Sequence, residues 1–188
     1  MNAPTFKANQ LPQGEVAHVV GSKDPELWHR TIPNIFKDTV YRFANREAAV
    51  FPEQEIRWTW AELDREVDAL AHGLLELGLQ KGDRVGIWSP NRYEWLLTQF
   101  ATARIGIILV TINPAYRVSE VEFALNKVGC KALITASHFK TSDYIGMLQD
   151  LAPELSRCEP GALTATKLAS LKTVIRTGPE TTSGMLNF

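Results

Sequence analysis

A repeated pattern of helix, glycine and short apolar strand constrains this sequence more than any other feature. Each repeat has a capping residue, an amphipathic stretch, a glycine and then a run of apolar, often β-branched residues. The expected strands are 84–88, 107–112, 131–135 and, after a longer interval, 173–175. Because helices that alternate with such strands are typical of parallel sheets, we expect an α/β fold with a largely parallel sheet and helices on both faces.

Capping residues and glycines predict where three helices begin and end. Thr59 and Glu62 have the spacing of a capping box, in which each side chain accepts a hydrogen bond from the backbone N–H of the other residue. A glycine adopts the left-handed conformation that ends a helix at little cost. The cap and final glycine of each helix are Thr59 with Gly78, Asn91 with Gly106, and Ser119 with Gly129.

The first of these helices, expected at 60–77, is amphipathic. Its leucines recur every three or four residues, which predicts that Leu70 and Leu74 are buried against the sheet. The acidic residues lie on the other side of the helix, at alternating positions that diverge around it. We therefore expect a solvated face, not a catalytic carboxylate pair, at Asp64, Glu66 and Asp68.

The chain is predicted to contain an N-terminal arm at 1–30 and one partial domain at 31–188. The arm is interrupted by prolines and glycine, so no regular element is expected there. Residues 31–43 predict a helix, and 48–51 and 56–58 predict two antiparallel strands that join the sheet before the parallel repeats begin.

Beyond residue 135 the periodicity weakens. A helix is expected at 140–151, a surface excursion at 154–167 and a loop from 178 to 184. No cap or polar tail follows the apolar residues near 188, so we expect the end of the chain to be a truncation.

Charge and cysteine content exclude several function classes. A net charge of −1 and a pI near 6.4 give no electrostatic basis for binding nucleic acid. The two cysteines, Cys130 and Cys158, form no CxxC motif, so we expect free thiols in a reducing compartment. No apolar run is long enough for a signal peptide or a transmembrane segment. We therefore expect a cytoplasmic protein, with peripheral membrane association left open.

Common motifs for phosphate binding, hydrolysis and metal binding are absent from the sequence. No Gly-x-Gly pair occurs, and Gly73 and Gly78 have phosphate-loop spacing but are followed by Leu79 instead of lysine. There is no nucleophile elbow and no Cys/His cluster for zinc. Neither a catalytic residue nor a metal ligand is predicted, and the histidines are scattered, at His18, His29, His72 and His138.

Two further groups of residues have both a functional and a structural interpretation. The tryptophans could stack a purine, but positions at strand ends and on a buried helix favour the core. Residues 181–184 (TTSG) resemble a phosphate-cradling loop in composition, but no lysine follows them, which favours a flexible connector. The tryptophans concerned are Trp58, Trp60, Trp88 and Trp95.

Asn113, Pro114 and Arg117 are the candidate ligand-proximal residues. They follow the carboxyl end of the second expected strand, where open α/β sheets bind ligands. Arg117 could approach a phosphate or a carboxylate. In the structural alternative, which the sequence favours, Asn113-Pro114 forms a turn and Arg117 pairs with Glu120 or Glu122.

Two blocks of the sequence carry a family resemblance. The first consists of 59–63 (TWAEL), 73–78 (GLLELG) and 81–85 (KGDRV), and the second of 103–106 (ARIG) and 111–117 (TINPAYR). In this order and spacing they resemble the AMP-forming acyl-CoA synthetases of the adenylate-forming superfamily, over about residues 31–188. The sequences of residues 112–117 and 184–188 are most similar to those of the medium- to long-chain fatty-acid branch of this family.

The resemblance implies the N-terminal portion of the large domain of an adenylate-forming enzyme. Intact members use ATP, Mg²⁺ and CoA: the acid is adenylated with release of pyrophosphate and then transferred to CoA. The family's phosphate loop, ribose-binding aspartate and catalytic lysine have no matching position here. No catalytic or cofactor-binding residue is carried over, and we expect this chain alone to be inactive and to bind none of these molecules specifically.

Three interpretations remain open at this stage. The first is the N-terminal part of a fatty-acyl-CoA ligase whose partners are a fatty acid, ATP and CoA. The second is a non-catalytic interaction or oligomerisation module that descends from the family. The third is a ligase for another carboxylic acid. In each, uncovered apolar surface would make a homo-oligomer possible.

Overall fold

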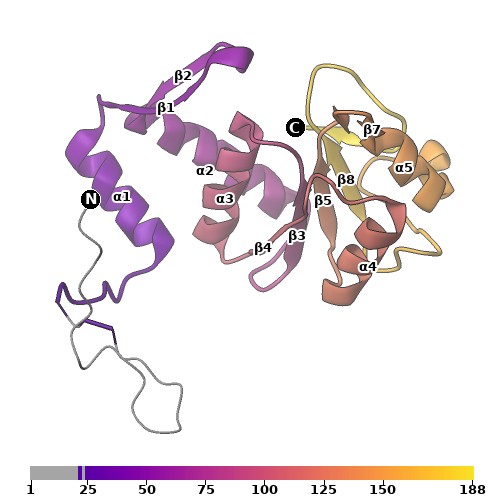
Figure 1. Ribbon diagram of the computed structural model, residues 1–188, viewed down its shortest axis with the longest axis horizontal. Coiled ribbons are helices and arrows are strands. Elements are labelled where there is room, and N and C mark those ends of the chain that lie inside the picture. The colour runs from indigo at the N-terminus through magenta and orange to yellow at the C-terminus, as the bar shows by residue number, and fades with distance from the viewer. Residues whose placement is uncertain (1–20, 23) are drawn as a thin grey trace, which may run out of the picture. The chain divides into compact units, whose positions relative to one another are not determined.

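The computed structural model describes residues 21–22 and 24–188 (Figure 1). The chain divides after Thr31, and every helix and strand given below belongs to the unit Ile32–Phe188. Most of the predicted N-terminal arm, including His18, lies outside the described residues. The division of the chain into an arm at 1–30 and a partial domain at 31–188 therefore stays a prediction.

A five-stranded sheet in the order β4-β3-β5-β8-β9 forms the centre of this unit, and all four pairs of neighbouring strands are parallel (Figure 1). This arrangement confirms the prediction of a largely parallel sheet, and all four expected strands are present. Within this sheet, only the short edge strand β9 was not predicted. The strands are β3 (Arg84–Trp88), β4 (Ile108–Thr111), β5 (Ala132–Thr135), β8 (Thr173–Arg176) and β9 (Leu186–Asn187).

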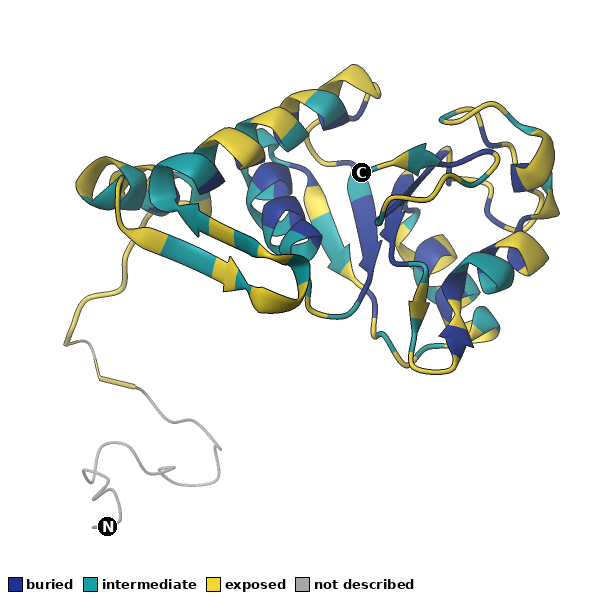
Figure 2. Ribbon diagram, turned by 90° about the horizontal axis from the view of Figure 1, so that it is seen from above, coloured by how far each residue is buried: buried dark blue, intermediate teal, exposed yellow. Residues whose placement is uncertain are grey.

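Helices cover both faces of the sheet, as the sequence predicts. Successive side chains of a strand point to opposite faces, so Leu133 and Ile134 of β5 enter different cores. Leu133 packs with α4 (Val118–Val128) and α5 (Tyr144–Leu151), and Ile134 packs with α2 (Trp60–Glu76) and α3 (Tyr93–Ile105). The central strands are accordingly buried along their length (Figure 2).

Helix α2 confirms the predicted capping box. The backbone N–H of Glu62 donates to Thr59 Oγ1 at 3.3 Å, and the N–H of Thr59 donates to Glu62 Oε2 at 2.8 Å. Leu74 is buried, as expected, but Leu70 is only half-buried. The burial predicted for Leu70 is wrong because this residue lines an open groove beside the sheet.

The acidic side of α2 is solvated only in part: Glu66 is exposed, as the sequence predicts, but Asp64 and Asp68 contact α3. Arg104 of α3 forms ion pairs with both Asp64 and Asp68, and its bond to Asp64 Oδ1 is 2.6 Å long. The two carboxylates are four residues apart, so they lie on the same side of the helix and meet one guanidinium. Packing of α3 against α2 thus turns a polar face into an interhelical contact.

The predicted first residues of α3 and α4 are wrong. Helix α3 begins after Arg92, without a side-chain cap of its own, and Gln54 Oε1 accepts the Tyr93 N–H at 2.9 Å. The cap expected at Asn91 is therefore replaced by a residue far away in sequence. Both predicted glycine stops, Gly106 and Gly129, have the left-handed conformation.

Helix α4 begins at Val118, one residue before the predicted cap Ser119. It follows Arg117, whose backbone N–H donates to Glu120 Oε2 at 2.8 Å. Because Glu120 accepts the N–H of Arg117, Arg117 is the residue that caps the helix. Ser119 therefore lies inside the helix and not at its cap. An acidic side chain in the first turn also interacts favourably with the helix dipole.

Two expected antiparallel strands are present but do not join the main sheet. They are β1 (Glu47–Phe51) and β2 (Ile56–Thr59), connected by the 3-10 helix η2 (Pro52–Gln54) and paired only with each other. Strand β2 ends at Thr59 and α2 begins at Trp60, so no residues lie between them that could extend β2 toward the main sheet. The hairpin, together with α1 (Ile32–Phe43), packs on the helix layer instead.

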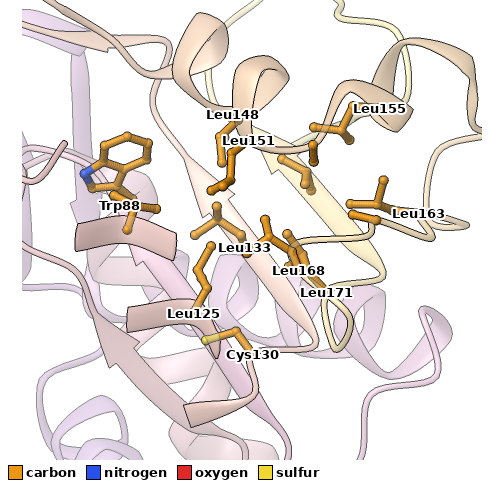
Figure 3. Packing of buried hydrophobic residues seen from close by; sticks show 14 of the residues in the cluster. Trp88, Leu125, Cys130, Leu133, Leu148, Leu151, Leu155, Leu163, Leu168 and Leu171 are labelled. Carbon is orange, nitrogen blue, oxygen red and sulfur yellow. The ribbon is translucent and has the colours of Figure 1, made fainter. Parts of the chain in front are cut away.

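The segment after β5 is more ordered than the sequence suggests. A short hairpin of β6 (His138–Phe139) and β7 (Ser142–Asp143) precedes α5, so the helix expected from residue 140 begins later. The predicted surface excursion at 154–167 is wrong in part, because Leu155 and Leu163 are fully buried. These leucines pack with α5 and close one core (Figure 3).

Among residues 21–22 and 24–188, no helix combines the length and the apolar character needed to cross a membrane.

Candidate functional site

The carboxyl ends of the central strands form the part of the fold where a ligand site is expected. The chain passes from β3 to β4 on one side and then to β5 on the other, so the order reverses between β3 and β5. Ligands of open α/β sheets bind outside the carboxyl ends at such a reversal. Trp88, Thr135 and Arg176 lie in register there, on the last row of three neighbouring strands.

The predicted candidates Asn113 and Pro114 form a tight turn after β4. Asn113 Oδ1 accepts the Ala115 N–H at 2.9 Å, and its backbone carbonyl accepts the Tyr116 N–H at 3.0 Å. A side-chain oxygen that binds the backbone two residues later is typical of turns that begin with asparagine. The geometry supports the structural interpretation of Asn113, while any ligand contact stays a prediction.

Tyr144 fixes this turn to the end of β3. Its hydroxyl donates to the Pro114 carbonyl at 2.5 Å, and its ring stacks on Trp88 with 3.7 Å between ring centroids. Burial raises the pKa of Tyr144 to about 12, so the phenol stays a neutral donor near neutral pH. The turn is therefore held in place by the core, and Tyr144 was not identified from the sequence.

Arg117 lies on the surface at the start of α4. The backbone N–H of Arg117, not its guanidinium, contacts Glu120, which differs from the predicted side-chain pair. Within the described part of the chain the guanidinium has no ion pair. Arg117 thus remains the candidate cation of this turn, and its role in binding an anion stays a prediction.

Arg176, at the end of β8, is a buried cation that the sequence analysis missed. Its Nη1 donates to Thr182 Oγ1 at 2.7 Å and its Nη2 to Glu180 Oε2 at 2.6 Å, while the buried Nε has no partner among the described residues. An arginine directly after an apolar strand, on the ligand side of a sheet, is the signal that could have identified it.

The contacts of Arg176 correct the prediction for residues 181–184. Arg176 binds Thr182, and Ser183 Oγ donates to the Ser156 carbonyl at 3.2 Å. Gly184 has φ +73°, and a Cβ placed there would lie 1.9 Å from the Leu155 carbonyl oxygen. The segment is thus a fixed loop between β8 and β9, not a flexible connector.

Polar residues are buried at the same ends of the sheet. Thr135 Oγ1 lies 3.0 Å from the Ala136 carbonyl, and the Trp88 indole N–H is buried without a partner among the described residues. Figure 3 shows this indole nitrogen turned away from the leucine side chains of the core. Trp88 belongs to that core, which agrees with the structural interpretation of this tryptophan.

The other candidate chemical groups do not form a recognisable catalytic site. Ser137 Oγ and His138 Nδ1 are 3.0 Å apart at an exposed position, but no carboxylate orients the imidazole in the described residues. Burial raises the pKa of the Cys130 thiol to about 11, which keeps it protonated and unreactive. Both cysteines are free.

The described residues also lack a donor set that fits a metal ion. In the part of the chain that the structure describes, no three His, Cys, Asp or Glu side chains are grouped to hold one. No chemical step is therefore derived through a metal on these residues.

A family comparison identifies the fold. The model of the AMP-binding enzymes matches residues 36–182, which is most of the chain. The chain therefore belongs to the AMP-binding enzyme family.

Curated relatives place this chain within longer enzymes. It is 47% identical over 167 residues to the medium-chain acyl-CoA ligase ACSF2, mitochondrial, of Rattus norvegicus, a match covering 89% of this chain and 27% of the relative. It is 38% identical over 163 residues to a protein of Bacillus subtilis (strain 168) named "Putative acyl-CoA synthetase YngI". That match covers 87% of this chain and 30% of the relative. The chain thus spans about a quarter to a third of the length of these relatives.

Solved structures show the same fold at lower identity. A fatty acyl CoA synthetase from Mycobacterium tuberculosis aligns with a TM-score of 0.65 and 23% identity, over 78% of this chain and 26% of that chain. The anthranilate CoA ligase AuaEII, in complex with anthranoyl-AMP, aligns with a TM-score of 0.69 and 20% identity, over 84% and 26%. The fold is therefore that of part of an adenylate-forming enzyme.

Proposed function

We propose that this chain is the N-terminal part of an ATP-dependent, AMP-forming acyl-CoA ligase. The observation that carries the proposal is the family match over residues 36–182, supported by 47% identity to a medium-chain acyl-CoA ligase. Because the chain spans only about a quarter of that relative, the complete activity is assigned to the longer protein.

The proposed reaction has two steps in the longer protein. A carboxylate oxygen of the acid attacks the α-phosphate of ATP, which forms an acyl adenylate and releases pyrophosphate. The thiol sulfur of CoA, having lost its proton, then attacks the acyl carbon, which forms a thioester and releases AMP. Both steps need cationic groups that stabilise charge on the reacting oxygens, and Mg²⁺ bound with ATP would supply part of that charge.

This chain contributes a scaffold and, at most, peripheral contacts to that reaction. We propose Asn113, Pro114 and Arg117 as ligand-proximal, with Arg117 as the group that approaches an anion. Support comes from the exposure of Arg117 and from its turn, which lies after the carboxyl end of β4. We propose no specific binding of ATP, Mg²⁺ or CoA by this chain alone.

The acyl group is proposed to be a medium- or long-chain fatty acid. The name of the rat relative supports the medium-chain choice. A ligase for an aryl acid is the alternative, since AuaEII has the same fold, but its identity of 20% supports the fold alone. A non-catalytic module is not favoured, because the named relatives are ligases and synthetases.

The cellular location belongs to the proposal as well. We propose a reducing compartment, which the free Cys130 and Cys158 support. The sequence favours the cytoplasm, whereas the name of the rat relative includes mitochondrial. Imaging of a fluorescent fusion with a mitochondrial marker would distinguish these two locations.

Sequencing of the reading frame downstream of Phe188, followed by an acid panel, tests the proposed function. A Thr/Ser/Gly-rich loop followed by lysine is expected in the downstream frame. The purified longer protein should release pyrophosphate with medium- or long-chain fatty acids and not with anthranilate or acetate. A longer protein that forms no adenylate with any acid would overturn the ligase assignment, and preference for anthranilate would overturn only the choice of acid.

A further inference from the structure

Tyr144 lies where the loops after three neighbouring strands meet. It is the first residue of α5, and its backbone N–H donates to the carbonyl of Ser137, just after β5, at 3.0 Å. Its ring stacks on Trp88, the last residue of β3, with an interplanar angle of 13°. Its hydroxyl donates to the carbonyl of Pro114, in the turn after β4, at 2.5 Å. Tyr144 therefore ties together the carboxyl ends of β3, β5 and β4.

The surroundings of Tyr144 hold its side chain in place. The ring is fully buried, in a core that also contains Leu148 of the same helix. Asp143, the preceding residue, caps α5 by accepting the Gly146 N–H at 3.0 Å. Because core side chains are close-packed, the hydroxyl is held at a defined position beside the turn after β4.

The turn that Tyr144 holds carries the candidate cation Arg117. Pro114 is three positions before Arg117, and the Tyr116 N–H between them donates to the Asn113 carbonyl at 3.0 Å. Arg117 is exposed, and its own N–H is bonded to the first turn of α4. A shift of this backbone would move the guanidinium relative to a bound substrate, and a misplacement of about 1 Å can lower a rate about a hundredfold.

A role in stability alone is the alternative for Tyr144. The core requires only its ring, because phenylalanine fills nearly the same volume. The hydroxyl adds a contact that goes to the turn and not to the core. Loss of the hydroxyl would leave the buried side of that contact without its donor and would cost some stability in either case. Stability therefore does not distinguish the two roles, whereas dependence on Arg117 does.

We propose that Tyr144 is a positioning residue that holds the guanidinium of Arg117 in place for an anionic group of a substrate. This inference rests on the proposed function, since the reaction takes place in the longer protein. Tyr144 itself does not touch the substrate. It acts through the Pro114 carbonyl and the turn, so its effect on the reaction should disappear when the charge of Arg117 is removed.

A double-mutant cycle in the longer protein tests the proposal. Tyr144→Phe removes the hydroxyl and keeps the ring, and Arg117→Gln removes the charge. We expect Tyr144→Phe to lower kcat/KM about three- to tenfold, and Arg117→Gln at least about tenfold, for the same substrate among fatty acid, ATP and CoA. In the Arg117→Gln protein, the further change Tyr144→Phe should alter kcat/KM less than about twofold. Single effects that multiply in the double variant would overturn the proposal.

The pH dependence separates positioning from proton transfer. Because burial raises the pKa of Tyr144 to about 12, its hydroxyl remains a donor near neutral pH. The ratio of kcat/KM between the parent and Tyr144→Phe should therefore be constant from about pH 6 to about pH 9. A ratio that changes in this range would contradict a positioning role. Tyr41→Phe, which changes an exposed tyrosine of α1, is the control and should leave kcat/KM unchanged.

Hydrogen exchange in the full chain tests the positioning without any turnover. In Tyr144→Phe, the turn amides of Ala115 and Tyr116 should exchange at least about threefold faster than in the parent, and in Tyr41→Phe they should not change. Unchanged exchange in Tyr144→Phe would overturn the proposal, as would unchanged kcat/KM for every substrate in either single variant. A longer protein that forms no acyl-CoA would overturn the ligase assignment, and exchange of the turn would still decide whether Tyr144 positions it.

Discussion

Arg104 shows at the scale of single residues how a polar sequence pattern becomes an interior contact. Its guanidinium is mostly buried and binds Asp64 and Asp68 of the neighbouring helix. The spacing of these acids predicted their common helix but not their partner, which comes from 36 and 40 positions further along the chain. Residue types alone therefore suggested a solvated face that packing converts into an ion-pair network.

A double-mutant cycle on Asp64 and Arg104 should show coupling. We expect Asp64→Ala and Arg104→Ala to destabilise the protein, with a coupling energy of about 0.5 to 2 kcal/mol because the two side chains share a partly buried contact. Glu66→Ala, on the exposed side, should stay within about 0.5 kcal/mol of the parent. Urea unfolding of the parent, the three single variants and the Asp64→Ala/Arg104→Ala double variant measures these terms. Strictly additive effects of the Asp64 and Arg104 substitutions would contradict the ion pair.

The Asp83 carboxylate should make stability depend on pH. Its ion pair with Lys131, at 2.7 Å, and the hydrogen bond from the Gln80 N–H hold the pKa of Asp83 below its ordinary value. Because the pKa of Asp83 is lower in the folded than in the unfolded protein, its carboxylate stabilises the fold at pH values above the unfolded pKa of about 3.9. This stabilisation is lost as the pH falls through the pKa of Asp83 in the folded protein.

Asp83→Asn is therefore expected to cost about 1 to 3 kcal/mol at pH 7 and progressively less below about pH 4. Denaturant unfolding at several pH values measures the difference from the parent. Glu53→Gln, at an exposed position, serves as the control and should show no such trend. A cost for Asp83→Asn that is constant down to pH 2 would contradict the assignment.

At the scale of elements, glycines define ends that the chain cannot easily change. Gly106, Gly129 and Gly184 all have positive φ angles, but only Gly184 also lies against another backbone. It sits where the loop after β8 turns back to form β9 beside the Leu155 carbonyl. The fifth strand begins two residues after this close approach.

Gly184→Ala and Gly73→Ala should change stability in opposite directions. At Gly184 the new Cβ would be strained by φ and would overlap Leu155, so we expect a loss of about 2 to 4 kcal/mol. At Gly73 the same substitution meets open space in a helix and should add about 0.5 to 1 kcal/mol. Thermal melts of both variants provide the test, and a neutral Gly184→Ala would contradict the loop geometry.

Local sequence signals predicted the main strands and the ends of the helices. The features that the sequence did not predict depend on contacts between residues far apart in the chain. Glycine stops such as Gly106 need only the backbone freedom of one residue, so the sequence identifies them. The start of α3 depends on Gln54, which lies about forty positions earlier. Strand β9 has only two residues and exists because it pairs with β8, so its own composition gives no strand pattern.

The candidate site was predictable only in its position at the sheet edge. Asn113 and Pro114 follow a strand, and the topology places that strand end beside β3. Tyr144 and Arg176 contribute contacts through a distant helix and a loop, and neither has a motif around it. Their importance depends on burial, which one sequence does not reveal.

At the scale of the whole molecule, the open edge of β4 is expected to promote self-association. Ile108 is 52% exposed on this edge strand, and the strand carries no charge or proline that would prevent pairing. Light scattering of the purified chain should show species larger than a monomer. Ile108→Lys should reduce them, Ile108→Val should not, and a monomeric parent chain would contradict the expectation.

Ligase activity of a chimera tests the central claim most directly. In the rat relative, this chain replaces the matching quarter of the sequence, and the chimera is given fatty acids, ATP, Mg²⁺ and CoA. We predict that the chimera releases pyrophosphate and forms acyl-CoA at rates within about tenfold of the parent enzyme. This difference corresponds to an increase in activation free energy of no more than about 1.4 kcal/mol. This chain alone should show only background activity. A chimera that unfolds like the parent but forms neither product would contradict the assignment, as would turnover by the isolated chain.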